Sequence, residues 1–160
     1  MSGAGPDEVR FIADAMLGRL ATWMRIIGCD VEYERDIDDA ALVIRALTEG
    51  RVILTRDRLL TRRRGVRGRT VFIESDRLFD QLRQAVMAFG ISRKQLFTRC
   101  IRCNTVLKSV EKAEVEGLVP EYVYQTQGRF SRCPSCRRVY WAGTHRGHVE
   151  RALGRVFGVA

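Results

Sequence analysis

Apolar and polar positions follow two different periods over the first ninety residues. Four short apolar segments, at residues 9–13, 30–34, 51–55 and 70–74, have the composition of β-strands. Between and after them, apolar residues recur every three or four positions, which predicts helices that end at Gly28, Gly50 and Gly90. Strands separated by helices of this length predict an α/β fold with right-handed crossovers and a mostly parallel sheet that has helices on both faces.

The pattern changes beyond residue 93. Val119 and residues 122–124 predict a strand, Gly128 a turn, Phe130 a strand that leads into Cys133, and residues 139–141 a further strand. These short segments are typical of an antiparallel ribbon, and we expect a helix at the C-terminal end. The sequence therefore predicts two domains, an α/β domain at residues 8–93 and a small ribbon domain at residues 94–160.

Four of the five cysteines form two C-x-x-C pairs, Cys100 with Cys103 and Cys133 with Cys136. A two-residue spacer lets both thiolates of a pair face one tetrahedral ion, so the pairs predict a structural Zn²⁺ site. Two redox dithiols or two disulfides are the alternatives. A reducing compartment disfavours disulfides, and the surroundings of neither pair resemble a strand-to-helix redox motif. We expect Cys29 to be an ordinary buried thiol.

Length and composition limit the class of protein. A chain of 160 residues corresponds to one ordinary domain, or to one compact domain with a small appendage. No apolar segment approaches the roughly 20 residues of a membrane-spanning helix, and the N-terminus lacks the features of a secretory signal. We therefore expect a globular cytoplasmic protein without a membrane span.

The excess of positive charge indicates the class of partner. The chain has 28 Lys and Arg against 19 Asp and Glu, a net charge of +9, and arginine supplies nearly all the cations. Because a guanidinium group matches the oxygens of a phosphate, nucleic acid is the leading partner class. Eight arginines surround Asp57 between residues 51 and 69, and such a run is either a solvated loop or a phosphate-binding surface. The predicted nucleic-acid contacts are Arg19, Arg25, Arg56, Arg58, Arg62, Arg63 and Arg64.

Aromatic side chains are frequent in and near the predicted ribbon. They could stack on the bases of single-stranded nucleic acid, or they could form the small core of the ribbon itself. These residues are Tyr122, Tyr124, Phe130, Tyr140 and Trp141.

A carboxylate follows each of the four predicted strands. Asp14 follows the first strand, Asp38 and Asp39 open the helix after the second, Asp57 follows the third and Asp76 the fourth. Because the carboxyl ends of parallel strands meet at one edge of a sheet, we expect these side chains to converge. Their oxygens suit Mg²⁺ or Mn²⁺, which activates water in phosphodiester cleavage. Each acid alone could instead cap a helix or lie in a turn, and it is the coincidence at four strand ends that favours catalysis.

Several motifs occur in a characteristic order along the chain. They are DAMLGRLA at residues 14–21, WMRIIG at 23–28, DIDD at 36–39, ILTRD at 53–57, the two C-x-x-C pairs, and YWAGTH at 140–145. Together they resemble the Mut7-C RNase family over nearly the whole chain. The resemblance implies a PIN-like nuclease fold, a three-layer α/β/α sandwich, followed by a zinc ribbon, and it implies metal-dependent cleavage of RNA.

The resemblance also assigns roles to the acids. Asp14 and Asp57 match the acidic positions of the family, and Asp39 matches the acid that opens the helix after the second strand, with Asp38 as a close competitor. The family pattern is loose at the position of Asp76. In the last motif the chain has Thr144 at a position where the family more usually has a serine.

Two other classes of phosphate chemistry are disfavoured by single residues. A receiver domain needs a lysine near the end of a late strand, and no lysine precedes Lys94. A haloacid-dehalogenase-like phosphatase needs a second aspartate two residues after the first, and position 16 is Met16. The sequence therefore predicts a metal-dependent ribonuclease that acts on RNA, with single strands favoured by the aromatic residues and a zinc ribbon that aids binding. The alternative is a non-catalytic RNA-binding module that uses the same basic surface.

Overall fold

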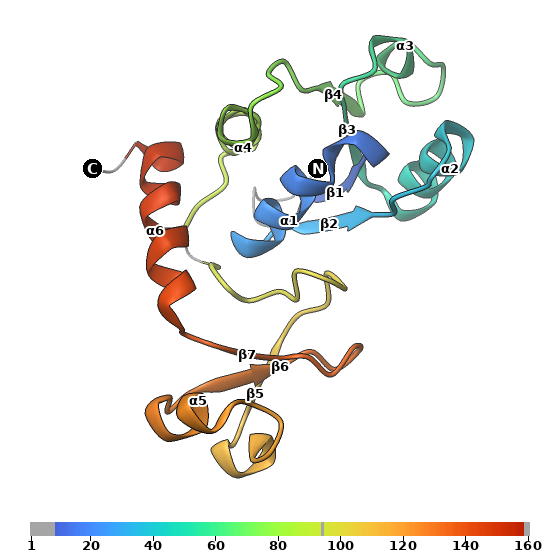
Figure 1. Ribbon diagram of the computed structural model, residues 1–160. Coiled ribbons are helices and arrows are strands. Elements are labelled where there is room, and N and C mark those ends of the chain that lie inside the picture. The colour runs from blue at the N-terminus through green and yellow to red at the C-terminus, as the bar shows by residue number, and fades with distance from the viewer. Residues whose placement is uncertain (1–8, 94, 159–160) are drawn as a thin grey trace, which may run out of the picture.

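Four parallel strands form the central sheet of the protein. The computed structural model describes residues 9–93 and 95–158, and Figure 1 shows how its elements are arranged. The strands are β1 (Arg10–Ala13), β2 (Asp30–Tyr33), β3 (Val52–Thr55) and β4 (Thr70–Phe72). They lie in the order β2-β1-β3-β4, and every neighbouring pair is parallel. Each end of these strands lies within two residues of its predicted position.

Helices follow the strands and cover both faces of the sheet. They are η2 (Ala15–Leu17, a 3-10 helix) and α1 (Gly18–Ile26) after β1, α2 (Asp39–Glu49) after β2, α3 (Arg58–Thr61) after β3, and α4 (Leu78–Phe89) after β4. Helix α2 begins at Asp39 because the Asp38 carboxylate accepts a hydrogen bond from the N–H of Ala41 at 2.8 Å. Gly50 and Gly90 end α2 and α4 in the left-handed conformation, as the sequence pattern predicts.

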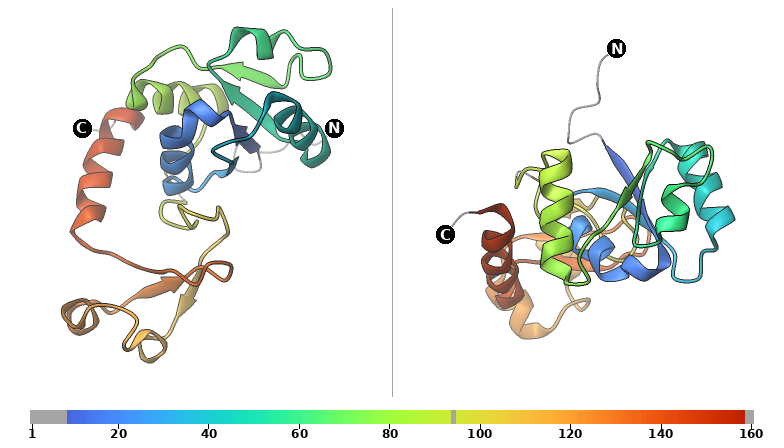
Figure 2. Two further views of the ribbon diagram at one scale, coloured as in Figure 1. Left: turned by 45° about the vertical axis from the view of Figure 1, so that its right-hand side comes forward. Right: turned by 90° about the horizontal axis from the view of Figure 1, so that it is seen from above.

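Two hydrophobic cores hold the layers together, one on each face of the sheet. Because side chains alternate along a strand, Phe11 and Ala13 of β1 join the core that contains α1 and α4. Ile12 of the same strand points the other way and joins Leu42 of α2 and Leu60 of α3. Figure 2 shows the two helical layers on either side of the sheet. The predicted α/β class, with a parallel sheet between helices, is confirmed.

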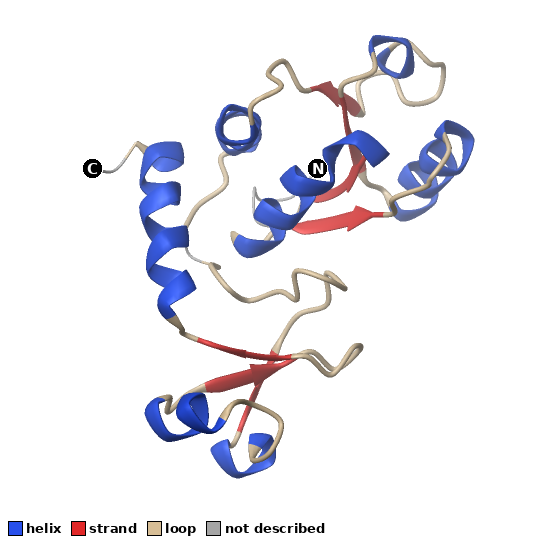
Figure 3. Ribbon diagram, in the orientation of Figure 1, coloured by secondary structure: helices blue, strands red, loops and turns tan. Residues whose placement is uncertain are grey.

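The second part of the chain is a small antiparallel ribbon. Its elements are β5 (Lys108–Val110), η3 (Lys112–Val115), α5 (Glu121–Thr126), β6 (Phe130–Arg132) and β7 (Val139–Trp141), and it is followed by α6 (Thr144–Phe157). The three strands lie in the order β5-β6-β7. Figure 3 shows this sheet with its two short helices at one end. The predicted strands at 130 and at 139–141 are therefore confirmed, and β5 was not anticipated.

One predicted strand is wrong, because residues 121–126 form helix α5. The β-branched and aromatic side chains between Val119 and Tyr124 favour a strand, but Pro120 immediately precedes the helix. Proline suits the start of a helix because its φ is already helical and its missing N–H is not needed there. Glu121 then accepts a hydrogen bond from Gln125 one turn later, at 2.9 Å. These effects at the helix start outweigh the weak β-propensity of the segment.

Helix α6 packs against the α/β domain. Its residues Leu153 and Val156 are buried in the core that contains α1 and α4. The predicted division into residues 8–93 and 94–160 stays a prediction, and residues 8, 94, 159 and 160 lie outside the described part of the chain. Among the helices of residues 9–93 and 95–158, none is long and apolar enough to cross a membrane.

The turn that holds the first cysteine pair docks on the free edge of the sheet. Strand β2 is an edge strand, and Val31 directs its N–H and C=O groups away from β1. The N–H of Val31 donates to Oδ1 of Asn104 at 3.0 Å, and its C=O accepts from Nε of Arg25 at 2.9 Å. Arg25 also donates to the backbone carbonyl of Ile101 at 3.0 Å. Two side chains therefore satisfy a strand edge that would otherwise be open to other chains.

A cluster of charged side chains extends this contact. Oδ1 of Asp30 accepts hydrogen bonds from Nδ2 of Asn104 and from Arg51, both at 2.7 Å. Arg51 is almost fully buried and also donates to the carbonyl of Phe11 at 3.0 Å. Burial opposes the ionisation of Asp30, but the hydrogen bonds from Arg51 and Asn104 outweigh it and hold the pKa of Asp30 below its usual value. The cluster fixes Asn104 in the orientation that Val31 requires.

The docking contact predicts a specific loss of stability. Asn104 has a φ of 65°, a left-handed conformation that glycine adopts freely. Asn104→Gly therefore removes only the side chain, and we expect the free energy of unfolding to fall by about 1–3 kcal/mol because a buried N–H loses its acceptor. Asn104→Ala adds the cost of a left-handed alanine, about 1–2 kcal/mol. Denaturant unfolding checks both values, and a glycine variant as stable as the wild type would contradict the role of the side chain.

Candidate metal centre and acidic edge of the sheet

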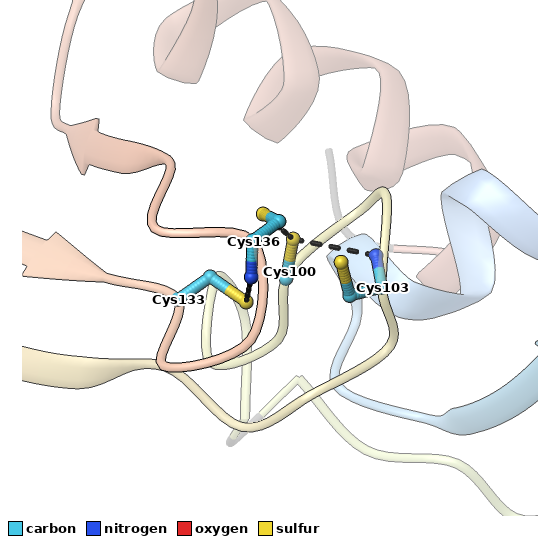
Figure 4. Close-up of side chains that lie close together, drawn as sticks. All are labelled: Cys100, Cys103, Cys133 and Cys136. Carbon is cyan, nitrogen blue, oxygen red and sulfur yellow. Dashed lines mark hydrogen bonds between the residues drawn. The ribbon is translucent and has the colours of Figure 1, made fainter.

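The four cysteines of the two C-x-x-C pairs lie together between the ribbon and the sheet. Figure 4 shows that they come from two facing turns, residues 100–103 and residues 133–136. Their Sγ atoms all lie within 4.8 Å of one another, and those of Cys100 and Cys136 are 3.7 Å apart. Four thiolates at about 2.3 Å from a tetrahedral zinc ion are about 3.8 Å apart. The cluster could therefore bind a metal ion such as zinc.

The two cysteine turns have the same backbone geometry. In the first, the N–H of Asn104 donates to the carbonyl of Cys100 at 2.9 Å, and in the second the N–H of Arg137 donates to the carbonyl of Cys133 at 2.9 Å. The residue after each pair is left-handed, with φ of 65° at Asn104 and 64° at Arg137. In each turn the first sulfur also lies 3.4 Å from the N–H of the second cysteine, Cys103 or Cys136. Such N–H groups stabilise the charge of thiolates that bind a metal.

Tyr140 supports the cluster from strand β7. Its hydroxyl accepts a hydrogen bond from the N–H of Ile101 at 3.3 Å and lies 3.1 Å from Sγ of Cys100. Burial opposes the ionisation of Cys100, but hydrogen bonds from Tyr140 and from the N–H groups of Cys103 and Arg102 outweigh it and lower the pKa of Cys100 to about 7. A thiol with this pKa is readily deprotonated, as metal binding requires.

The second site lies at the carboxyl edge of the parallel sheet, where β1 and β3 are neighbours. Asp14 follows β1 directly and is 8% exposed, and its N–H donates to the carbonyl of Leu54 in β3 at 2.9 Å. The hydroxyl of Thr55 donates to Oδ2 of Asp14 at 2.7 Å and accepts from the N–H of Asp57 at 2.9 Å. Thr55 thus links the two acids that follow adjacent strands. Thr55 lies inside the ILTRD motif, but no local pattern of the sequence marks it as the link between the two acids.

Tyr33 and Gly18 fix the turn that carries Asp14. The hydroxyl of Tyr33, at the end of β2, donates to the carbonyl of Ala15 at 2.9 Å. The ring lies against Gly18, where an added Cβ would come within 2.7 Å of the Tyr33 hydroxyl oxygen. Any larger residue at position 18 would displace the tyrosine, which explains the glycine in the DAMLGRLA motif. The role of Tyr33 could not be identified from sequence because the contact joins β2 to η2, which lie far apart along the chain.

The other predicted acids are all exposed, and one of them caps a helix. The carboxylate of Asp38 caps α2, while Asp39 is exposed in the first turn of the same helix. Asp76 is exposed and does not cap α4, whose N-terminal cap residue is Arg77. Within the described residues, the four cysteines are the one group of three or more potential ligands close enough to share an ion. The assignment of Asp14, Asp57 and the other acids to catalysis stays a prediction.

The predicted nucleic-acid contacts separate into buried and exposed arginines. Arg25 is 5% exposed and donates to the backbone of β2 and of the first cysteine turn, so its guanidinium has a structural role. Arg56 donates to the carbonyl of Ile73 at 2.9 Å, and Arg58 lies over the ring of Phe72, 4.2 Å from its centroid. The remaining predicted contacts, Arg19, Arg62, Arg63 and Arg64, are exposed.

The fold and the cysteine cluster define an α/β protein that carries a small ribbon with four cysteines that could bind a metal ion. The model of the Mut7-C RNAse domain family matches residues 9–153, and the chain belongs to this family. The resemblance found in the sequence is confirmed. No curated protein and no solved structure gives a significant match to the chain. The family suggests a nuclease or RNA-related role, with RNA as the substrate.

Metal removal should affect the ribbon more than the sheet. Because the ribbon is small, a metal bound to the four cysteines would supply most of its stability, and we expect chelation to abolish amide protection in residues 99–143 while β1 and β3 remain protected. Native mass spectrometry should find one zinc ion per chain and none in Cys133→Ser. Cys29→Ser is the matched control and should retain the ion. Unchanged hydrogen exchange after complete metal removal would contradict the structural role of the metal.

The link through Thr55 predicts a second loss of stability. Thr55→Val keeps the shape of the side chain but leaves the N–H of Asp57 and one oxygen of Asp14 without their partner. We expect the free energy of unfolding to fall by about 1–3 kcal/mol. Thr55→Ser retains the hydroxyl and should fall by less than about 1 kcal/mol. A Thr55→Val variant as stable as the wild type in denaturant unfolding, with the larger loss in Thr55→Ser, would show that the methyl group matters and the hydroxyl does not.

Proposed function

We propose that the protein is a metal-dependent ribonuclease whose catalytic acids are Asp14 and Asp57. The observation that carries the proposal is the position of these residues after β1 and β3, the two strands between which the strand order reverses. At such a point the connections leave toward opposite faces of the sheet, and the opening between them is where doubly wound folds bind substrates. Membership of the Mut7-C RNAse domain family supports RNA as the substrate.

The chemistry of the donors fits a hard divalent cation. Each carboxylate offers about four lone-pair sites, so the hydrogen bonds that Asp14 receives from Thr55 and Met16 leave others for a ligand. Mg²⁺ usually binds to one or two carboxylates together with substrate phosphates, and it does not require a cage of protein ligands. Mg²⁺ or Mn²⁺ held by Asp14 and Asp57, with Asp39, Asp38 and Asp76 as further candidates, would supply Lewis-acid activation of water and stabilise the leaving oxygen.

The residues of the chain would bring the phosphodiester to the acids. The oxygen of a water molecule attacks phosphorus in line, and the bond from phosphorus to the leaving ribose oxygen breaks. Thr55 and Tyr33 hold the Asp14 turn in place before the substrate arrives. Exposed arginines beside Asp57, among them Arg62, Arg63 and Arg64, would neutralise the neighbouring phosphates. We place this reaction in the cytoplasm, where a thiolate metal site is stable against oxidation.

A non-catalytic RNA-binding protein is the second candidate. The observation that favours it is the spacing of the acids, since no three carboxylates of the described residues lie close enough to share an ion. In that case the basic surface would bind RNA without cleaving it.

Substitution of the two acids separates these candidates. Asp14→Asn and Asp57→Asn should each lower cleavage of end-labelled RNA by about 100-fold or more in the presence of Mg²⁺ or Mn²⁺, because each removes a metal ligand. Binding of the same RNA at fixed salt should be unchanged or tighter, since a negative charge that faces phosphate is lost. Glu116→Gln, which removes an exposed charge from the ribbon, is the matched control and should cleave at the wild-type rate.

Two outcomes would contradict the proposed ribonuclease activity or the role of Asp14. Salt-sensitive binding without cleavage under either metal would assign the chain to the second candidate. Loss of binding and cleavage together in Asp14→Asn, with a lower unfolding temperature, would make Asp14 a structural residue.

A further inference from the structure

A basic hollow lies on the ribbon, on a different part of the molecule from the acidic edge. It has a volume of about 650 Å³, and its lining includes Arg102, Arg132, Arg137, Arg138 and Trp141. In Figures 1 and 2 the ribbon strands lie at the opposite end of the molecule from α3, which follows Asp57. The function proposed above does not use this hollow.

Four arginines line the hollow, together with Cys136 of the candidate metal cluster. None of its described lining residues is acidic, and within the described chain none of its four arginines forms an ion pair. Arg102, Arg137 and Arg138 are exposed, so their guanidinium groups are available to a ligand in solution. Four neighbouring cations without an ion-pair partner repel one another, and an anionic ligand with several phosphates would relieve this repulsion.

The backbone of the second cysteine turn fixes the position of Arg137. Its φ of 64° is a left-handed conformation in which an arginine costs more free energy than a glycine. The carbonyl of Arg137 accepts a hydrogen bond from Nε of Arg132 at 3.2 Å, so two of the arginines are coupled. In the equivalent position of the first turn, the side chain of Asn104 makes the docking contact described above. An arginine at this position is explained by what its side chain can bind.

Trp141 adds an aromatic surface to the arginines. Its indole is 38% exposed, and its Nε1 atom lies against Gly143, where an added Cβ would approach to 3.3 Å. The ring is therefore held by the backbone while part of it stays open to solvent. Phe130 by contrast is buried in the ribbon, and the hydroxyl of Tyr140 contacts Cys100, so these two aromatic residues serve the ribbon itself.

We infer that this hollow binds a segment of single-stranded RNA, with phosphates against Arg102, Arg137 and Arg138 and a base stacked on Trp141. Arginines that track phosphates beside an aromatic ring are the combination by which single strands are bound without base pairing. The inference deepens the proposed function and rests on it for the choice of RNA as the partner. The RNA segment in the hollow lies away from the phosphodiester bond that is cleaved.

The two tryptophans allow a direct test. Trp23→Phe leaves Trp141 as the single tryptophan of the chain, and Trp23 is outside the lining of the hollow. Titration with single-stranded oligouridylate, without added Mg²⁺ or Mn²⁺ and without a chelator, keeps the zinc and avoids cleavage. We expect the fluorescence of Trp141 to be quenched on binding, because stacking on a base quenches an indole. Unchanged fluorescence at saturating RNA would overturn the inference.

Variants then identify the residues that bind RNA. Binding is measured by the fluorescence anisotropy of labelled RNA. Trp141→Ala should weaken binding by about 5-fold to 100-fold, the range for loss of one stacked base. Arg137→Gln with Arg138→Gln should weaken it and reduce the slope of log affinity against log salt by about 1.4, because two contacts with the phosphates of a single strand are lost. Arg129→Gln and Lys108→Gln are matched controls, since both residues are exposed on the ribbon outside the hollow. Equal losses in the controls would show that only net charge or general exposure matters, and would overturn the inference.

Three further outcomes separate the possible partners and the two proposals. Quenching by polyglutamate as strong as that by RNA would indicate an acidic protein partner and would overturn the RNA assignment. Cleavage that depends on Asp14 with no change at Trp141 would support the ribonuclease and reject the hollow. Quenching at Trp141 without any cleavage would support the hollow and reject the ribonuclease.

Discussion

The hydrogen bonds at Val31 join the two parts of the chain. An edge strand must find partners for its free N–H and C=O groups, and here Asn104 and Arg25 supply them. Arg25 lies near the end of α1, a helix of nine residues and therefore about 14 Å long. The other end of α1 follows the turn that carries Asp14. One helix thus connects the cysteine turn to the acidic edge, and neither site is independent of the packing of α1 against β2.

The elements of the α/β domain could be predicted from sequence because their signals are local. Strand composition, the periodic apolar residues of α2 and α4, and glycines at positions 50 and 90 all act within a few residues. Helix α3 was missed because its four residues, Arg58–Thr61, are too short to show a period. The strand predicted between Val119 and Tyr124 failed for a related reason, since the start of a six-residue helix depends on one proline and one acid more than on the side chains that follow.

The sites could be predicted only in part. The C-x-x-C spacing fixes the metal ligands locally, and the cluster of Sγ atoms agrees with it. The acids could be assigned to one edge of the sheet because the strands are parallel. The side chains that hold them could not be predicted, because Thr55 and Tyr33 reach the Asp14 turn from other strands. The structural role of Arg25 could not be predicted either, because the sequence presents it as a surface residue. An arginine on a helix is ordinarily taken for a surface residue, and only the position of the cysteine turn over β2 makes it a buried donor.

The two cysteine turns show how one backbone shape can serve two purposes. Both place the residue after the second cysteine in the left-handed conformation, and both bond its N–H to the first cysteine. At Asn104 this conformation directs a short amide toward the sheet, where it accepts a hydrogen bond from Val31 and donates one to Asp30. At Arg137 the same conformation directs a long cation to an exposed hollow that lacks an acid among its described residues. A metal bound by both turns would therefore anchor the ribbon on one side and arrange its charged surface on the other, so the stability of the ribbon and the geometry of that surface would depend on the same four sulfur atoms.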